Sequence, residues 1–246
     1  MFLENVEAHR VTGNCAEEIT DPVAAEDLVT IYVNNETVSV QVASISDLRE
    51  LGAGFVVSEG ISDKIISSEA ERNNVYVYTK EPDISGLQKD TGSSGGTEYI
   101  SSPKKVSSGI KVCSEDIIHA TKEIVSDVWK KTGGVHCSVL FRDGQTLCKM
   151  SDVGRHNTLD KIIGYAVLNG IETCGCYVGC TGRQPAGMVK KCANAGIPLI
   201  ISKAAATVSG IKTAEKAGIT LICFARGDRY TIYTNPWRVC GIDYRR

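Results

Sequence analysis

Two short runs of β-branched residues are the first regular pattern in the chain. Residues 28–33 and 37–42 partly alternate between apolar and polar side chains, and Asn34-Asn35 separate them. Asparagine tolerates the positive φ angles of a tight turn, so this pattern predicts a β-hairpin. A third run, residues 75–79, predicts a further strand.

A helix is predicted between these strands, from residue 47 to about residue 57. Ser46 stands in the position of an N-cap and Gly60 follows the end, as is typical of helix termini. The apolar face of this helix is expected to consist of Leu48, Leu51 and Phe55.

Residues 81–109 are polar and rich in glycine and serine. They show neither the alternation of a strand nor the spacing of an amphipathic helix. A gap of this length is typical of an inter-domain connection or a functional loop. We therefore predict a small α+β domain at residues 1–110, with residues 81–109 as its terminal loop, and an α/β domain at residues 111–246.

Two amphipathic helices are predicted early in the second domain. Ser114 and Gly133 bracket a stretch with an acidic first turn and a basic last turn, which complements the helix dipole and predicts one continuous helix. Asn157 is placed to cap a second helix over residues 158–168, with a regular apolar stripe.

Strands and helices alternate along the rest of the chain. Asp143-Gly144 is a strong hairpin signal between two antiparallel strands. The later strand–helix–strand alternation predicts parallel strands with right-handed crossovers. The predicted strands are residues 138–142, 145–150, 176–180, 198–202, 219–225 and 230–234, and the predicted helices run from Pro185 to Gly196 and over residues 208–217.

The carboxyl ends of parallel strands meet at one edge of a sheet, where open α/β folds bind ligands. Residues 181–184, 203–205 and 226–229 form three loops that are expected to share this edge. Residues 151–157 form a fourth loop, which joins them only if the strand before it runs in the same direction.

Each of these loops carries a cation, in several cases beside a glycine. Two of the loops precede predicted helix N-termini, which suit anions, and arginine makes bidentate contacts with phosphate. A single arginine in a surface loop is commonly just solvated, whereas the four loops together predict a phosphate pocket. Its cations are Arg155, Arg183, Lys203, Arg226 and Arg229.

Two histidines and two aspartates lie near these loops in the sequence. His156 fits a general acid, a hydrogen-bond donor to a ligand or a structural residue, and the sequence leaves the three alternatives open. His136 precedes an apolar strand and is expected in the core. Asp152 and Asp160 are expected to orient neighbouring cations rather than to act as an acid–base pair.

Composition excludes several classes of protein. The 246 residues are 42% hydrophobic and 23% charged, as in ordinary globular proteins. The 27 basic and 29 acidic residues give a net charge of −2, which argues against nucleic acid or an anionic membrane as a partner. Ten cysteines occur without a signal-peptide pattern or an apolar run of membrane-spanning length, so we expect reduced thiols and a cytoplasmic location.

No structural metal is expected. The chain has no C-x-x-C, and the residues after His136 do not match the H-x-E part of the zinc deaminase motif. Cys174, Cys176 and Cys180 would lie too far apart along an extended strand to bind one tetrahedral zinc ion, although the glycines between them could break such a strand.

Five segments carry a resemblance to a known family. They read NNETVSVQVASISDLRELGAGFVVSEGI, TGGVHCSVLF, SDVGRHNTLDKIIG, GIPLIISKAAAT and GITLICFARGDRYTIYT. These are similar to the hallmarks of the FdhD family, the formate dehydrogenase accessory proteins. The resemblance extends from about residue 25 to residue 240, and its most specific part is the D-V-G-R-H-N…D-K block.

The resemblance implies a C-terminal domain with the three-layer cytidine deaminase-like fold, without the deaminase zinc site. Members of the family take sulfur from a cysteine desulfurase as a persulfide. They pass it to the molybdenum cofactor, in its bis(molybdopterin guanine dinucleotide) form, before the cofactor enters formate dehydrogenase. The implied partners are therefore a cysteine desulfurase and the formate dehydrogenase catalytic subunit, and the implied assembly is a homodimer.

The cofactor-binding segment of the family matches residues 224–229 here, and a cofactor with two pyrophosphates is the kind of ligand that the cationic loops predict. The matching residues are Phe224, Ala225, Arg226, Gly227, Asp228 and Arg229. Together with the loops, the predicted cofactor contacts also include Asp152, Arg155, His156, Lys161, Thr181, Gly182, Arg183 and Lys203.

The sulfur-carrying cysteines of the family lie in a C-G-x-C-G loop, and the matching residues 91–98 contain no cysteine. Sulfur transfer needs a nucleophilic thiolate, which serine does not supply. Cys113 and Cys137 are then the candidate carriers if the protein is a sulfurtransferase. Two alternatives stay open, a chaperone that binds the cofactor without carrying sulfur, and a paralogue that binds another guanine or pterin nucleotide.

Overall fold

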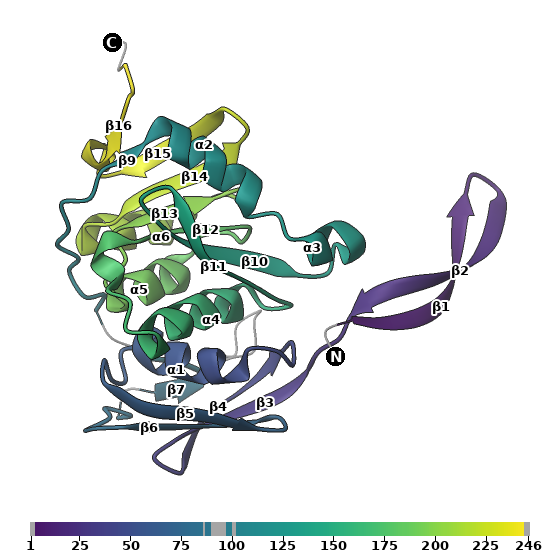
Figure 1. Cartoon of the computed structure of the whole chain (residues 1–246), viewed down its shortest axis with the longest axis horizontal. Coiled ribbons are helices and arrows are strands. Elements are labelled where there is room, and N and C mark those ends of the chain that lie inside the picture. The colour runs from purple at the N-terminus through teal and green to yellow at the C-terminus, as the bar shows by residue number, and fades with distance from the viewer. Residues whose placement is uncertain (1–2, 86, 90–96, 100–101, 244–246) are drawn as a thin grey trace.

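Two sheets lie on either side of a double layer of helices (Figure 1). The structure is a computed structural model that describes residues 3–85, 87–89, 97–99 and 102–243. The expected mixed α/β class is confirmed. No helix among the described residues is both long and apolar enough to cross a membrane.

The larger sheet is mixed and has six strands. They are β10 (His136–Arg142), β11 (Gln145–Asp152), β12 (Tyr177–Cys180), β13 (Leu199–Ser202), β14 (Thr220–Arg226) and β15 (Arg229–Thr234), in the order β11-β10-β12-β13-β14-β15. As predicted, β12, β13 and β14 are parallel to one another. One face packs on α4 (Arg155–Leu168), α5 (Ala186–Asn194) and α6 (Val208–Ala217), and the other face packs on α2 (Ser114–Glu123).

The smaller sheet has the order β4-β3-β6-β5 and packs on a single helix, α1 (Leu48–Glu59). The predicted hairpin is present, because Asn34 and Asn35 have φ angles of 47° and 70° in the turn. The strands are β3 (Asp27–Val33), β4 (Glu36–Ala43), β5 (Ile65–Glu71) and β6 (Asn74–Thr79).

An antiparallel ribbon of two strands, β1 (Leu3–Thr12) and β2 (Cys15–Ala24), projects away from both sheets (Figure 1). No pattern in the sequence predicted this ribbon, since its side chains are mostly exposed and carry no amphipathic pattern. The remaining short elements are β7 (Leu87–Lys89), β8 (Thr97–Tyr99), β9 (Val112–Cys113), β16 (Val239–Cys240), α3 (Asp127–Thr132), and the 3-10 turns η1 (Thr173–Gly175) and η2 (Pro236–Arg238).

The predicted helix between Ser114 and Gly133 is in fact two helices, α2 and α3. The chain leaves the helical path after Ile124, and the Ser126 hydroxyl accepts a hydrogen bond from the Trp129 amide at 3.1 Å. The Ser126 hydroxyl caps a free backbone amide at the start of α3. A second helix therefore begins where the first was expected to continue.

Two predicted caps are also wrong. Asp47 rather than Ser46 occupies the N-cap of α1, in the left-handed region with a φ of 51°. Helix α4 begins at Arg155 behind Gly154, so Asn157 lies inside the helix. The side chain of Asn157 instead donates to the Val42 carbonyl of β4, which is far away in the chain, and to nearby Asp152.

Helices α1 and α4 cross with their backbones in contact. A Cβ added to Gly54 would lie 1.7 Å from the Asp160 carbonyl oxygen, and one added to Gly164 would lie 1.8 Å from the Glu50 carbonyl oxygen. Any side chain at either position would therefore force the two helices apart. This crossing joins the smaller sheet to the larger one.

We expect Gly54→Ala and Gly164→Ala each to lower the free energy of unfolding by at least about 3 kcal/mol, because the added methyl group meets backbone that has no room to move. Urea unfolding followed by circular dichroism measures this loss. Gly109→Ala is the matched control, since a Cβ there meets nothing within 4 Å. Equal stability of Gly54→Ala and Gly109→Ala would contradict the described crossing.

Candidate functional site

All four predicted loops lie at the same edge of the six-stranded sheet. Strand β10 is antiparallel to both of its neighbours, so β11 runs in the same direction as β12. The register places His136 opposite Asp152, Ser138 opposite Cys180, and Cys180 opposite Ser202. The loop at residues 151–157 therefore lies at the same edge as the other three loops. The first residue of β10 also lies at this edge. His136, predicted for the core, is only half-buried there.

Thr181 and Gly182 are held firmly at the end of β12. The Thr181 hydroxyl accepts a hydrogen bond from the Cys137 amide at 3.0 Å and lies 3.2 Å from His136 Nδ1. The Gly182 carbonyl accepts from Ser202 and Gln184 at 2.7 and 2.9 Å. A Cβ at Gly182 would approach the Arg155 Cβ to 2.8 Å, so glycine leaves the room that Arg155 occupies.

Arg155 has a buried guanidinium nitrogen without a described acceptor, since its Nε has no hydrogen-bond partner among the described residues. Burial and then the charge of Arg183 lower the pKa of Arg155, and burial followed by Arg155 lowers the pKa of His136. Burial and neighbouring positive charge therefore disfavour the charged forms of both groups, and a bound anion would favour them. We call His136, Arg155, Arg183, Lys203 and Arg226 the cationic edge.

Lys203 and Arg226 occupy the next two loops. Lys203 Nζ donates to the Thr121 carbonyl at 3.1 Å, and Arg226 Nε donates to the Lys203 carbonyl at 3.4 Å. Burial and then Arg226 lower the pKa of Lys203. The loops thus form two pairs of neighbouring cations, Arg155 with Arg183 and Lys203 with Arg226.

The segment at residues 224–229 is a strained turn between β14 and β15. Phe224 has a φ of 52°, which is unusual for a bulky residue, and its side chain is 39% exposed. Ala225 is fully buried, and Gly227 reaches a φ of 59° where the chain reverses. Asp228 and Arg229 line a groove of about 740 Å³ along β15.

His156 is a neutral imidazole. Burial, then the charges of Lys191 and Arg155, lower its pKa to about 3. At neutral pH the ring is therefore not an imidazolium that could donate a proton. This argues against the general-acid role that the sequence left open. Hydrogen bonding to a ligand and a structural role both fit a neutral ring.

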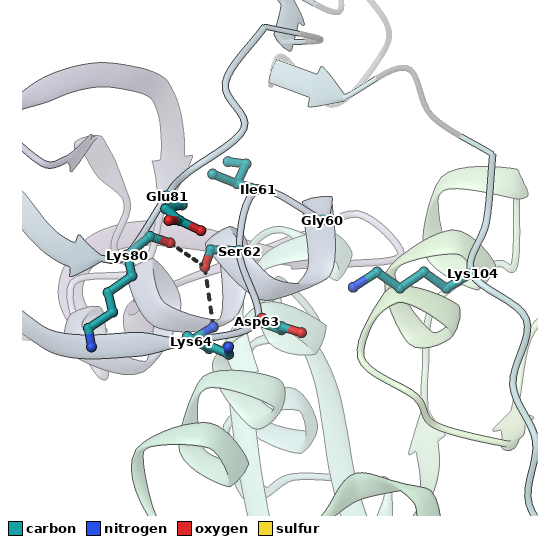
Figure 2. Close-up of a pocket in the computed structure, with 8 residues that line it drawn as sticks. All are labelled: Gly60, Ile61, Ser62, Asp63, Lys64, Lys80, Glu81 and Lys104. Atoms are coloured by element: carbon teal, nitrogen blue, oxygen red, sulfur yellow. Dashed lines mark hydrogen bonds between the residues drawn. The ribbon is translucent and has the colours of Figure 1, made fainter.

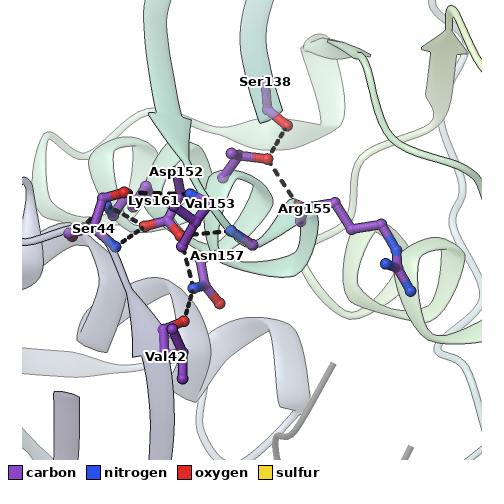
Figure 3. A network of polar contacts seen from close by, with 10 residues as sticks. Val42, Ser44, Ser138, Asp152, Val153, Arg155, Asn157 and Lys161 are labelled. Atoms are coloured by element: carbon purple, nitrogen blue, oxygen red, sulfur yellow. Dashed lines mark hydrogen bonds and ion pairs between the residues drawn. The ribbon is translucent and has the colours of Figure 1, made fainter. Parts of the chain in front are cut away.

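Asp152 and Lys161 lie behind the cationic edge rather than on it (Figure 3). Both are fully buried, and Lys161 Nζ is 2.6 Å from Asp152 Oδ2. The Ser44 amide donates to Asp152 and the Ser44 carbonyl accepts from Lys161, each at 3.1 Å. Figure 3 shows Arg155 extending away from this cluster. The pair therefore fastens the loop before α4 to the end of β4.

A second buried ion pair crosses the same boundary, and sequence reasoning missed its partners. Lys191 of α5 lies 2.6 Å from Glu59 and 2.9 Å from Asp160. Ser58 donates to Asp160 at 2.6 Å, and Asn194 donates to the Ser58 carbonyl at 2.8 Å. Burial raises the pKa of Asp160 to about 6 and outweighs the lowering by Lys191 and by the Ser58 hydrogen bond, while the charge of Glu59 adds to the rise. No pattern in the sequence links α1 to α5, since these residues are far apart along the chain.

We expect Asp152→Ala to lower the free energy of unfolding by about 3–5 kcal/mol, because it leaves the Lys161 ammonium buried without its carboxylate. Chemical denaturation measures the change. Asp127→Ala is the control, because it removes an exposed partner of Lys130 and is expected to change stability little. A small effect of Asp152→Ala would show that the pair does not hold the loop.

The two candidate thiols differ in accessibility. Cys137 is fully buried, so a sulfur donor does not reach it, and burial also raises its pKa. Cys113 is exposed, and its Sγ lies 3.0 Å from the Sγ of Cys240, a residue that sequence reasoning did not single out. Of the cysteine-free segment at residues 91–98, residues 91–96 lie outside the described residues.

A separate polar pocket of about 470 Å³ lies at the C-terminal end of α1 and also has three lysines. They are Lys64, Lys80 and Lys104, and Figure 2 shows the side chains of Lys80 and Lys104 extending in different directions. The side chains of Lys80 and Lys104 therefore do not form a close pair of cations. Within the described ranges, no group of three or more His, Cys, Asp or Glu side chains could hold a metal ion.

The sequence model of the FdhD/NarQ family matches residues 24–240, which is most of the chain. The chain belongs to the FdhD/NarQ family. It is 31% identical to Protein FdhD of Methanocaldococcus jannaschii over 235 residues, covering 95% of this chain and 97% of that protein. It is 34% identical to Sulfur carrier protein FdhD of Wolinella succinogenes over 258 residues, covering 97% of this chain and 90% of that protein. The family resemblance seen in the sequence is thus confirmed.

The fold is shared with a solved structure. The crystal structure of a putative formate dehydrogenase accessory protein from Desulfotalea psychrophila superposes with a TM-score of 0.81 at 24% identity. The match covers 97% of this chain and 100% of that one. At this identity the likeness shows the fold, including the mixed α/β arrangement described above.

Proposed function

We propose that this protein carries sulfur from a cysteine desulfurase to the molybdenum cofactor of formate dehydrogenase. The cofactor, in its bis(molybdopterin guanine dinucleotide) form, is the acceptor substrate and binds with a diphosphate at the cationic edge. The names of the relatives, sulfur carrier protein and formate dehydrogenase accessory protein, support this proposal. The protein is then a sulfurtransferase.

The buried and unpartnered Nε of Arg155 is the observation that carries the binding part of the proposal. A buried guanidinium N–H without an acceptor is costly, and a phosphate oxygen is the acceptor that fits it best. Arg183 stands close enough to lower the pKa of Arg155, so a diphosphate there would neutralise both cations. The residues present therefore fit the charged part of the cofactor.

Further parts of the proposal rest on family membership and on the sheet. We assign residues 111–246 to the cytidine deaminase-like fold, and α2 on one face of the sheet with α4, α5 and α6 on the other supports three layers. Residues 1–110 are the N-terminal domain. The proposed location is the cytoplasm, the proposed assembly is a homodimer, and the proposed partners are a cysteine desulfurase and the formate dehydrogenase catalytic subunit.

Guanosine diphosphate tests the binding site. We expect it to raise the melting temperature of the wild-type protein and to bind measurably in isothermal titration calorimetry. Arg155→Ala and Arg183→Ala are each expected to weaken binding at least about tenfold, because each removes a charge-assisted hydrogen bond to phosphate.

Lys80→Ala is the matched control, because Lys80 lines the other lysine-containing pocket (Figure 2) and its loss is expected to leave binding unchanged. Circular dichroism of each variant establishes that it is folded. Binding that Lys80→Ala weakens as much as Arg155→Ala, or no binding to the wild-type protein, would contradict a diphosphate site at the cationic edge.

A further inference from the structure

Two cysteines that are 127 residues apart in sequence lie side by side on a pair of short strands. Strands β9 and β16 are parallel, and Cys113 is directly opposite Cys240 in their register. Opposite residues on neighbouring strands have Cα atoms about 5 Å apart, which is inside the range that a disulfide spans. The two Sγ atoms are 3.0 Å apart, which is about 1 Å longer than a disulfide bond.

The two strands are braced around this sulfur pair. Lys111 Nζ donates to the Trp237 carbonyl and lies 5.0 Å from the centroid of the Trp237 ring, which links the chain before Cys113 to the chain before Cys240. Val112 and Val239 are both buried in the core under α2. The packing of Val112 and Val239 and the contact of Lys111 with Trp237 thus hold β9 and β16 in the register that pairs the two thiols.

The pair lies next to the groove along β15. Ser114 and Gly241, the residues that follow the two cysteines, line this groove together with Asp228 and Arg229. The Ser114 hydroxyl is 2.8 Å from the Tyr230 hydroxyl on β15, which holds this wall of the groove in place. Each cysteine is thus one residue away from a groove that reaches the turn at residues 224–229.

The two thiols differ in exposure. Cys113 is exposed and Cys240 is half-buried. The hydrogen bond and charge of Cys240, followed by burial and then by Asp116 and Glu115, raise the pKa of Cys113 to about 11. Cys113 is therefore the member of the pair that a sulfur donor reaches first, on account of its exposure and not of its acidity.

We propose that Cys113 and Cys240 are the thiol pair that carries and releases sulfur, with Cys113 as the persulfide carrier and Cys240 as the resolving cysteine. This inference rests on the proposed sulfur-carrier function and names the residues that perform it. It assigns to two strands far apart in sequence the chemistry that residues 91–98 lack, since that segment has no cysteine.

The chemistry consists of two exchanges. In the first, the Cys113 thiolate attacks the outer sulfur of a donor persulfide, a Cys113 persulfide forms, and the donor leaves as a thiolate. In the second, the Cys240 thiolate attacks Cys113 Sγ, the bond from Sγ to the outer sulfur breaks, and hydrosulfide leaves toward the acceptor. Two thiols are oxidised to the Cys113–Cys240 disulfide and the sulfane sulfur is reduced to sulfide. A dithiol reductant then returns two electrons and two protons to the pair.

Single-turnover sulfur transfer tests this assignment. A cysteine desulfurase is loaded with one persulfide, freed of cysteine and mixed without oxygen with wild-type protein, Cys113→Ser, Cys240→Ser or Cys174→Ser. Free thiols are alkylated, peptides are mapped by mass spectrometry, and released sulfide is measured. Cys174→Ser is the matched control, because Cys174 is also exposed but has no described sulfur neighbour at hydrogen-bonding distance. Melting temperatures establish that the variants are folded.

We expect wild-type protein and Cys174→Ser to release one sulfide for each Cys113–Cys240 disulfide that forms. Cys240→Ser is expected to retain the persulfide on Cys113 and to release sulfide at least ten times more slowly, and Cys113→Ser is expected to do neither. A persulfide on Cys15 or Cys174 with no disulfide would overturn the pair and leave the sulfur-carrier function standing. No persulfide on any cysteine of Cys240→Ser, together with neither disulfide nor released sulfide from the wild-type protein, would overturn both, and release by Cys240→Ser at the wild-type rate would overturn the resolving role.

Discussion

The backbone contact between α1 and α4 is the constraint on which the positions of the functional residues depend. Because Gly54 and Gly164 bring the two helices together, the end of β4 reaches the loop before α4, where Ser44 binds the buried pair of Asp152 and Lys161. That loop ends in Arg155. The smaller sheet therefore contributes no cation to the proposed site. It does hold in place the loop that ends in Arg155, whose Nε has no described partner.

The two proposed chemical functions lie at different places along the larger sheet. Anion binding is assigned to the strand ends, where loops from β11, β12, β13 and β14 meet. Sulfur chemistry is assigned to β9 and β16, beyond β15 on the face that α2 covers. The groove along β15 extends from the residues that follow the two cysteines to Asp228 and Arg229 in the turn after β14.

Local patterns in the sequence predicted the elements well, because periodicity and turn residues act over a few positions. The hairpin at Asn34-Asn35 and the parallel strands β12, β13 and β14 are examples. Long-range pairing was not predictable in this way. Asp152 and Lys161 were predicted as cofactor contacts because they are close to Arg155 in the sequence. In the structure they form a buried ion pair, and Ser44, from the other sheet, donates a hydrogen bond to Asp152. Cys240 was missed for the same reason, since only the register of β9 and β16 brings it to Cys113.

A crystal structure of the protein with guanosine diphosphate would test the central claim, that the cationic edge is the site of the cofactor diphosphate. The account predicts phosphate oxygens within hydrogen-bond distance of Arg155 Nε and of the Arg183 guanidinium, with Asp152 and Lys161 still paired beneath them. A diphosphate bound elsewhere, with Arg155 Nε still lacking an acceptor, would contradict it.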